Sequence, residues 1–219
     1  MYILDTINPR IVDDFINNLS CNKSNLIQDL HQYAIENKVP IIKDDVSSFI
    51  RNILLTKKPK RILELGTAIG YSAILMAETL SGNCTIDTIE KNNDMYDIAV
   101  KNIKTSGYKI NPIHGDALVE IKKLENTYDF VFIDAAKGHY KEFFDLIIPK
   151  LNNEAIIIGD NILHKGLVCL PLNEVPRRQR TIVRNMKAFI DYIYANDNIR
   201  TSILPIGDGL MVNNILNTL

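Results

Sequence analysis

The pattern of apolar and polar positions changes once along the chain, near residue 60. Before that point apolar residues recur every three or four positions, which is typical of amphipathic helices. The expected helices cover 11–19, 26–37 and 44–55, the last of them after a break at Pro40. After Lys60 short apolar runs of buried-strand character alternate with helical patterns. We therefore expect residues 1–55 to form a helical N-terminal appendage on an α/β region.

Strand and helix patterns alternate from residue 60 to about residue 195. The expected strands cover 61–65, 85–89, 109–114, 130–134 and 155–159. The expected helices cover 72–80, 92–106, 117–124, 140–148 and 176–195. Such alternation predicts a parallel sheet with helices on both faces, in which ligands bind at the carboxyl ends of the strands. Two further runs, 200–205 and 210–213, flank Gly207-Asp208-Gly209 and predict a closing hairpin.

Composition limits the class of protein without naming its chemistry. A length of 219 residues fits one domain, 1–219, and 46% hydrophobic with 23% charged residues is ordinary for a globular protein. The net charge of -1 neither favours nor excludes a nucleic-acid partner. The three cysteines, Cys21, Cys84 and Cys169, lack zinc spacing and are expected to be reduced thiols. With no signal-peptide pattern in 1–14 and no apolar run of membrane-spanning length, we expect a cytoplasmic protein.

The segment from Arg61 to Ser72 holds the most informative motif. A strand pattern with one acid, Glu64, leads into Gly66 and Gly70 and then into a helix. Glycines allow a tight turn and close approach to a ligand, and the helix N-terminus favours an anionic group. The Gly-x-x-x-Gly spacing differs from the Gly-x-Gly-x-x-Gly of dinucleotide-binding proteins. An acid at this loop suits a ligand that carries an amino group, such as S-adenosylmethionine.

Acids also close the next two strands. Glu90 comes twenty residues after Gly70 and can accept hydrogen bonds from both hydroxyls of a ribose. Asp116, in Gly115-Asp116-Ala117, can accept from the amino group of an adenine, and Ser72 can bind a carboxylate at the helix start. Glu90 and Asp116 can equally be strand-end polar residues and helix N-caps. Acids at three successive strand ends favour a ligand site.

Two later strands end in candidate metal ligands. Asp134 closes one strand, and Asp160-Asn161 follows the other. Three hard oxygen donors suit Mg²⁺, although an Asp-Asn pair can also simply cap a turn. Lys137 lies three residues after Asp134, and a nearby cation would favour its neutral amine, making it a candidate general base toward a hydroxyl. The alternative for Lys137 is an exposed side chain on a solvated helix.

The segment after residue 176 combines a basic face with an apolar stripe. The expected cations of this face are Arg177, Arg178, Arg180, Arg184 and Lys187. The expected core stripe is Ile182, Met186, Phe189, Ile190 and Ile193. Clustered arginines suit phosphate contacts with a folded RNA, but also a solvated surface or an acidic small molecule such as a coenzyme A thioester. His164 is expected to line the substrate pocket.

Together these residues resemble the metal-dependent class I O-methyltransferases, which include catechol and caffeoyl-coenzyme A O-methyltransferases. The motifs that carry the resemblance are the loop from Glu64 to Ser72, Glu90, Gly115-Asp116-Ala117, Asp134-Ala-Ala-Lys137, Asp160-Asn161 and Gly207-Asp208-Gly209. The resemblance runs from Val39 to the C-terminus. Within the group, the chain looks most similar to bacterial tRNA 5-hydroxyuridine O-methyltransferases.

The resemblance implies a Rossmann-like α/β fold with a mostly parallel seven-stranded sheet, the cofactors S-adenosylmethionine and Mg²⁺, a tRNA substrate and a homodimer. It implies catalysis by Lys137 as the base together with Asp134, and metal ligation by Asp134, Asp160 and Asn161. It implies cofactor contacts by Ile42, Glu64, Gly66, Ser72, Glu90, Asp116, Ala117 and Asp134.

Four functions compete at this point. The first is methylation of 5-hydroxyuridine at the tRNA wobble position to 5-methoxyuridine. A catechol or caffeoyl-CoA-type enzyme would keep every catalytic residue and differ in the partner of the arginines. A nicotinamide oxidoreductase is disfavoured by the glycine spacing and by Glu64. A non-catalytic RNA-binding module would leave Asp134, Lys137 and Asp160-Asn161 without a purpose.

Overall fold

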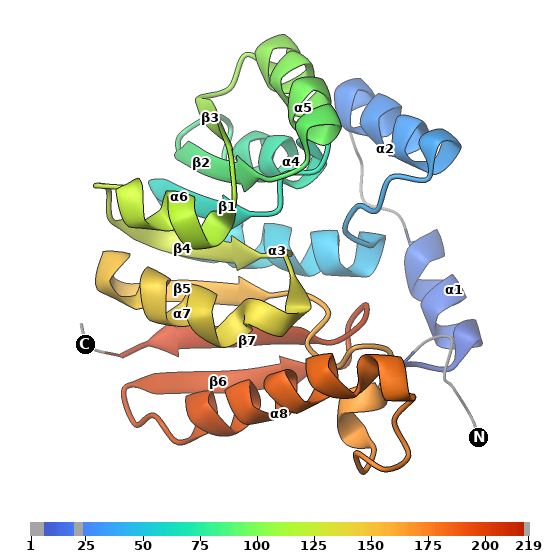
Figure 1. The fold of residues 1–219 in the computed structure, drawn as a ribbon. Coiled ribbons are helices and arrows are strands. Elements are labelled where there is room, and N and C mark those ends of the chain that lie inside the picture. Colours follow the sequence, from blue (N-terminus) through green and yellow to red (C-terminus); the bar gives the residue numbers. More distant parts are fainter. Residues whose placement is uncertain (1–6, 20–23, 217–219) are drawn as a thin grey trace. The chain divides into compact units, whose positions relative to one another are not determined.

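The computed structural model describes residues 7–19 and 24–216 (Figure 1). By their internal contacts these residues divide into two compact units. The first unit runs from Phe15 to Leu124, and the second combines the described residues up to Asp14 with those from Glu125 onward. Helix α1 (Arg10–Asn18) lies across the boundary between the two. The expectation of a single domain stays a prediction.

The first unit carries the glycine-rich loop on a parallel set of strands. Its helices are α2 (Asn25–Asn37), α3 (Asp44–Lys57), α4 (Tyr71–Thr79), α5 (Asn93–Ser106) and α6 (Ala117–Lys123). Its strands are β1 (Arg61–Leu65), β2 (Thr85–Glu90) and β3 (Ile110–His114). The strand order is β3-β2-β1, and both pairings are parallel, with Leu65 opposite Ile89 and Glu90 opposite His114. The glycine loop, Glu90 and Asp116 therefore all follow the carboxyl ends of neighbouring strands.

Local sequence explains where these helices begin and end. Ser24 caps α2 by accepting a hydrogen bond from the N–H of Ile27, and Asn92 caps α5 through the N–H of Met95. Gly107 ends α5 in the left-handed conformation that favours glycine. Helix α4 is apolar on almost every side and nearly all of it is buried, because it contacts α2, α3, α5, β2 and β3.

The second unit contains four strands and the remaining helices. Its elements are β4 (Tyr128–Ile133), a 3₁₀ turn Lys137–His139, α7 (Tyr140–Ile147), a 3₁₀ turn Ile148–Lys150, β5 (Leu151–Gly159), 3₁₀ turns Leu167–Cys169 and Arg177–Gln179, α8 (Arg180–Tyr194), β6 (Ile199–Leu204) and β7 (Leu210–Ile215). The strand order is β4-β5-β7-β6, in which β4 and β5 are parallel and β7 pairs antiparallel with both β5 and β6.

These strands confirm the expected fold class, an α/β Rossmann-like methyltransferase fold with a mostly parallel seven-stranded sheet and one antiparallel hairpin. Two boundaries differ most from the sequence pattern. Strand β5 begins at Leu151, with an irregular register against β4 and a left-handed Glu154 that interrupt its apolar pattern. Helix α8 begins only at Arg180, because the chain is extended at Pro176 and then forms a 3₁₀ turn.

Within the described ranges, no helix combines the length and the apolar character that crossing a membrane requires.

Candidate active site

The glycine loop of the first unit is held open by left-handed backbone and by hydrogen bonds to β2. Gly66 and Gly70 have φ values of 100° and 85°, and Ala68 has 45°. The N–H groups of Gly66 and Thr67 donate to the carbonyl of Ile89 at 3.0 and 3.3 Å. Because a side chain at φ near 85° is strained, Gly70 suits the sharp entry into α4. The backbone conformation and the hydrogen bonds to β2 therefore define the shape of the loop.

Glu90 contacts this loop directly. Its carboxylate accepts hydrogen bonds from the N–H of Ala68 at 2.8 Å and from the N–H of Asn92 at 2.7 Å. A carboxylate offers about four lone-pair directions, so two remain for the hydroxyls of a ribose. The structure thus gives Glu90 a positioning role on the loop, and its predicted ribose contact stays a prediction.

Glu64 lies in the protein interior and not on the solvent-exposed surface. Its side chain is fully buried, and its Oε2 accepts a hydrogen bond from the Thr88 hydroxyl at 2.5 Å. Since the Thr88 proton is used there, the Thr67 hydroxyl donates to Thr88 Oγ1 at 2.6 Å. Two hydroxyls therefore connect this acid to the loop residue Thr67. Sequence reasoning missed both threonines.

The remaining predicted cofactor residues of the first unit lie close to these elements in the sequence. Asp116 is the N-cap of α6: its Oδ1 accepts from the Leu118 N–H at 3.0 Å and its Oδ2 from the Lys91 ammonium at 2.8 Å. Ala117 is the first residue of α6. Ser72 is buried in the first turn of α4, and Ile42 is buried just before α3. The capping role considered for Asp116 is confirmed.

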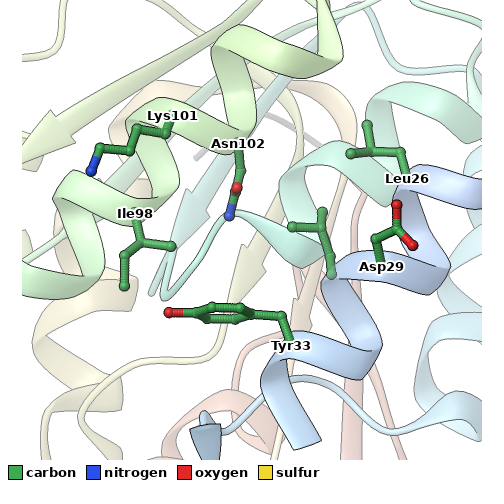
Figure 2. Close-up of a pocket in the computed structure, with 7 residues that line it drawn as sticks. Leu26, Asp29, Tyr33, Ile98, Lys101 and Asn102 are labelled. Atoms are coloured by element: carbon green, nitrogen blue, oxygen red, sulfur yellow. The ribbon is translucent and has the colours of Figure 1, made fainter. Parts of the chain in front are cut away.

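A cavity of about 400 Å³ lies between α2 and α5 in the same unit (Figure 2). Tyr33 of α2 and Ile98 of α5 lie on opposite sides of it. Asn102 also lines this cavity and donates a hydrogen bond from Nδ2 to the carbonyl of Ile69, inside the glycine loop, at 2.8 Å. None of the predicted cofactor residues lines the cavity, so it is distinct from the predicted cofactor site.

In the second unit the two candidate metal-binding acids lie side by side. Ile133 pairs with Gly159 at the last position of the parallel β4–β5 ladder, so Asp134 and Asp160 are the next residues on adjacent strands. The Asp160 N–H continues the ladder by donating to the Ile133 carbonyl at 2.9 Å. Asp160 Oδ1 accepts from the Asn161 N–H at 2.6 Å, and Asn161 has a left-handed backbone.

The pKa values of Asp134 and Asp160 are both raised above the ordinary value of an aspartate. Burial, followed by the nearby charge of Asp134, raises the pKa of Asp160 to about 7. Burial also raises the pKa of Asp134, against the opposing effect of the Lys137 ammonium. Lys137 begins the 3₁₀ turn after β4 and is half-buried. Asp134, Lys137 and Asp160 are therefore close enough for their charges to interact.

The donor set fits a divalent cation. The part of the chain that the structure describes contains no cluster of three or more His, Cys, Asp or Glu side chains that could hold a metal ion. However, two carboxylates and the side-chain oxygen of Asn161 are hard ligands of the kind that Mg²⁺ prefers. A bound cation would also relieve the repulsion that raises the pKa of Asp160. The residues present therefore fit Mg²⁺, although metal binding by them stays a prediction.

The loop after Asp160 is held by the Gly207-Asp208-Gly209 turn. The N–H groups of Ile162 and Leu163 donate to the carbonyls of Gly209 and Asp208 at 2.9 and 3.2 Å, and the Lys165 N–H donates to the Asp208 carboxylate. A Cβ at Gly209 would lie 2.4 Å from Leu163 Cγ, so only glycine permits this approach. The Gly-Asp-Gly signal was visible in the sequence, but its contact with this loop was not.

The basic segment differs from the expected continuous face. Arg177 and Arg178 lie in the 3₁₀ turn before α8 and are exposed, as is Arg184 on α8. Arg180 donates to the carbonyls of Val175 and Asn173 at 2.9 and 3.1 Å, and Lys187 donates to the carbonyl of Leu170 at 2.6 Å. These two cations therefore fasten the loop 170–175 to α8.

The apolar stripe of α8 largely matches the expected one. Met186, Phe189 and Ile193 are buried as expected, whereas Val183 takes the place expected for Ile182 and Ile190, which are half-buried. Val183 also packs with Leu167 and Val175, which lie in the segment between β5 and α8.

His164 lies in the loop that follows Asp160-Asn161. Its Nε2 lies 2.9 Å from Gln179 Oε1, and this contact connects that loop to the 3₁₀ turn before α8.

The sequence of this chain is similar to those of known proteins of one family. Residues 17–215 match the family model described as O-methyltransferase. A caffeoyl-CoA O-methyltransferase from Stellaria longipes is 30% identical over 166 residues, which cover 72% of this chain and 69% of that protein. Caffeoyl-CoA O-methyltransferase 5 from Nicotiana tabacum is 30% identical over 175 residues, or 76% of this chain and 73% of that protein.

Solved structures agree in fold. A caffeoyl-CoA O-methyltransferase-like protein from Staphylococcus aureus superposes with a TM-score of 0.83 at 31% identity, covering 94% of this chain and 98% of that one. An O-methyltransferase from Bacillus cereus, whose structure is a complex with SAH, has a TM-score of 0.81 over 94% of this chain and 97% of that one. At 23% identity, that second likeness concerns the fold alone.

Proposed function

This chain belongs to the O-methyltransferase family, as an S-adenosylmethionine-dependent enzyme of the caffeoyl-CoA O-methyltransferase-like group, and we propose a specific acceptor for it. The proposed reaction is methylation of 5-hydroxyuridine at the tRNA wobble position with the help of Mg²⁺. One observation carries the metal-assisted part of the proposal. A buried carboxylate, Asp160, and a half-buried one, Asp134, repel each other at adjacent strand ends, with a lysine amine close enough to interact with both. Such a site suits proton removal from a hydroxyl beside a cation.

Each residue has a distinct part in the proposed reaction. Asp134, Asp160 and Asn161 would hold Mg²⁺, which when bound would polarise the acceptor oxygen as a Lewis acid. Lys137 would accept the proton of the acceptor hydroxyl. The first unit would bind S-adenosylmethionine, the methyl donor, with the loop amides fixed by Glu90 and with Asp116 and Ala117 at the start of α6.

Two features support 5-hydroxyuridine as the acceptor. Its 5-hydroxyl and O4 carbonyl are vicinal oxygens, as in a catechol, so a donor set suited to catechols also suits this base. In addition, Arg177, Arg178 and Arg184 are exposed next to the loop that follows Asp160-Asn161, and arginines suit contacts with RNA phosphates. Arg180 and Lys187 support the proposal less, because their side chains bind main-chain carbonyls.

The second candidate is a small-molecule catechol or caffeoyl-CoA-type methyltransferase. The names of the similar plant proteins favour it, since they are caffeoyl-CoA O-methyltransferases. This alternative needs no change in the roles of Asp134, Lys137, Asp160 or Asn161. It differs only in the acceptor, so the substrate assay separates the two.

The test is methyl transfer from labelled S-adenosylmethionine to two acceptors in parallel. One is tRNA that contains 5-hydroxyuridine, purified from cells that lack this gene, and the other is a simple catechol. We expect strong labelling of the tRNA with Mg²⁺ and its loss with EDTA. Labelling of catechol alone would move the substrate to the second candidate, and labelling that survives EDTA would overturn the metal requirement.

A further inference from the structure

Tyr140 is a buried residue beside the two acids to which the sequence assigned no role. It is the first residue of α7 and directly follows the 3₁₀ turn that begins with Lys137. Its side chain is 1% exposed, although it carries a polar hydroxyl. A buried hydroxyl costs free energy unless it is hydrogen-bonded, so its partners indicate why it is placed there.

The hydroxyl of Tyr140 reaches the ends of both strands that carry the acids. Tyr140 Oη lies 3.0 Å from the carbonyl of Ile133 and 2.5 Å from the carbonyl of Asp160. The Asp160 N–H donates to the same Ile133 carbonyl at 2.9 Å. These bonds continue the β4–β5 connection one residue past its last ladder pair, Ile133 with Gly159. The tyrosine therefore fastens the backbone on which Asp134 and Asp160 stand.

The ring of Tyr140 fits closely between its neighbours. A Cβ at Gly159 would lie 2.8 Å from Tyr140 Cε1 and 2.9 Å from Met211 Cε, so the ring needs a glycine at this point of β5. On another side, the Tyr140 and Phe189 rings have centroids 5.5 Å apart. Close packing leaves the hydroxyl little freedom to leave the two carbonyls.

We propose that Tyr140 is a positioning residue that fixes the spacing of Asp134 and Asp160 for a divalent cation, acting through the carbonyls of Ile133 and Asp160. This inference rests on the metal requirement of the proposed function and adds a residue to it. The two carboxylates repel each other when no cation is bound, and a tie between their backbones opposes their separation. A cation would then meet two ligands whose backbones are already held together.

The test compares Tyr140→Phe with the wild-type protein in Mn²⁺ titrations without cofactor or acceptor, read by calorimetry and by the electron paramagnetic resonance signal of free Mn²⁺. Loss of an indirect support for metal ligands commonly lowers affinity, and we expect a loss of about 10-fold. Tyr192→Phe is the matched control: it removes the hydroxyl of a tyrosine of α8, which donates to Asp145 at 3.1 Å, and Mn²⁺ affinity should stay unchanged. Turnover of Tyr140→Phe should recover as Mg²⁺ is raised, and S-adenosylmethionine affinity should equal that of the wild type.

A second variant tests the same contact from strand β5, and its effect in the wild-type background does not depend on the folding of Tyr140→Phe. Gly159→Ala should displace the ring and lower Mn²⁺ affinity in the wild-type background, but add little loss in a Tyr140→Phe background. Equal Mn²⁺ affinity in wild type and Tyr140→Phe, or additive losses in the double variant, would overturn the positioning role alone. Absence of Mn²⁺ binding by the wild type would instead overturn the metal part of the proposed function, and this inference with it.

Discussion

The buried and half-buried acids make different kinds of contacts in the two units of this protein. In the first unit Glu90 accepts two backbone N–H groups, Asp116 accepts a backbone N–H and a lysine ammonium, and Glu64 accepts a threonine hydroxyl. In the second unit Asp134 and Asp160 oppose each other, and burial raises the pKa of both. The acids of the first unit thus accept hydrogen bonds from protein donors, whereas the repulsion between the two acids of the second unit would be relieved by a cation.

This difference indicates separate roles: in the first unit an acid positions a loop, and the acids of the second unit suit cation binding and proton transfer. Glu90, which accepts two backbone N–H groups, holds a loop in one shape, which suits binding of a cofactor. Acids that repel each other form a site where charge compensation by a cation, and proton transfer to a nearby amine, are favoured. Variants in the first unit should therefore change cofactor affinity, and variants in the second unit should change metal affinity and turnover.

The largest effect is expected for Lys137→Ala. Loss of the proposed general base should lower turnover about 10²–10⁴-fold, because such groups contribute this much to proton transfer. Affinity for S-adenosylmethionine, measured by calorimetry, should stay as in the wild type. The control is Lys141→Ala, which removes an exposed lysine that pairs with Asp145 on α7. Turnover of Lys137→Ala within a few-fold of the wild type would exclude the assigned base.

A smaller but measurable effect concerns pH. Asp160 has a pKa of about 7 in the folded protein against an ordinary value of 3.8, so the unfolded chain loses this proton first as the pH rises. Cation-free protein should therefore lose about 1–4 kcal/mol of unfolding free energy between pH 4 and pH 7, with little further change above. Urea unfolding at several pH values measures this.

In the same series, Asp160→Asn should flatten the pH dependence, whereas Asp145→Asn, which changes an exposed acid, should leave it intact. Mg²⁺ should restore stability of the wild type above pH 7 and have no such effect on Asp160→Asn. A decline of equal size in Asp160→Asn would show that another group causes it.

The third prediction addresses the first unit. Glu90→Ala removes the acceptor of the Ala68 and Asn92 N–H groups and the predicted ribose contact. Affinity for S-adenosylmethionine should fall about 10-fold to 100-fold, which corresponds to about 1–3 kcal/mol. Mn²⁺ affinity should not change, and Asp97→Ala, at an exposed acid of α5, should change neither. A parallel loss of Mn²⁺ affinity in Glu90→Ala would contradict the separation of the two units.

The sequence predicted the elements well because their signals are local. Apolar runs placed β1 and β2 within a residue, and the sequence correctly placed Glu90, Asp134 and Asp160 at the carboxyl ends of strands. Tyr140 escaped prediction because its role depends on carbonyls that only the folded strands bring within reach. Asn102 escaped for the same reason, since nothing in a helical pattern indicates a bond to the Ile69 carbonyl.

Periodicity also places a side chain on a face without showing what covers that face. Arg180 and Lys187 fall on the expected side of the basic segment, yet their partners are carbonyls of a loop whose course the sequence did not reveal. Conversely, Ile11, Phe15 and Leu19 of the α1 region remain exposed. The expected homodimer, which would bury such residues, stays a prediction.

The smallest effect is expected for the exposed arginines, and it bears on the acceptor. Charge reversal in Arg177→Glu combined with Arg184→Glu should weaken tRNA methylation about 3-fold to 10-fold through KM, and should lower the salt dependence of tRNA binding by about one unit of slope per arginine. Arg200→Glu, at an exposed position of β6, controls for net charge. Because Arg180 fastens the loop 170–175, its replacement should instead impair tRNA and catechol alike. Equal losses on both acceptors for the Arg177 and Arg184 variant would remove the RNA argument and leave the small-molecule enzyme.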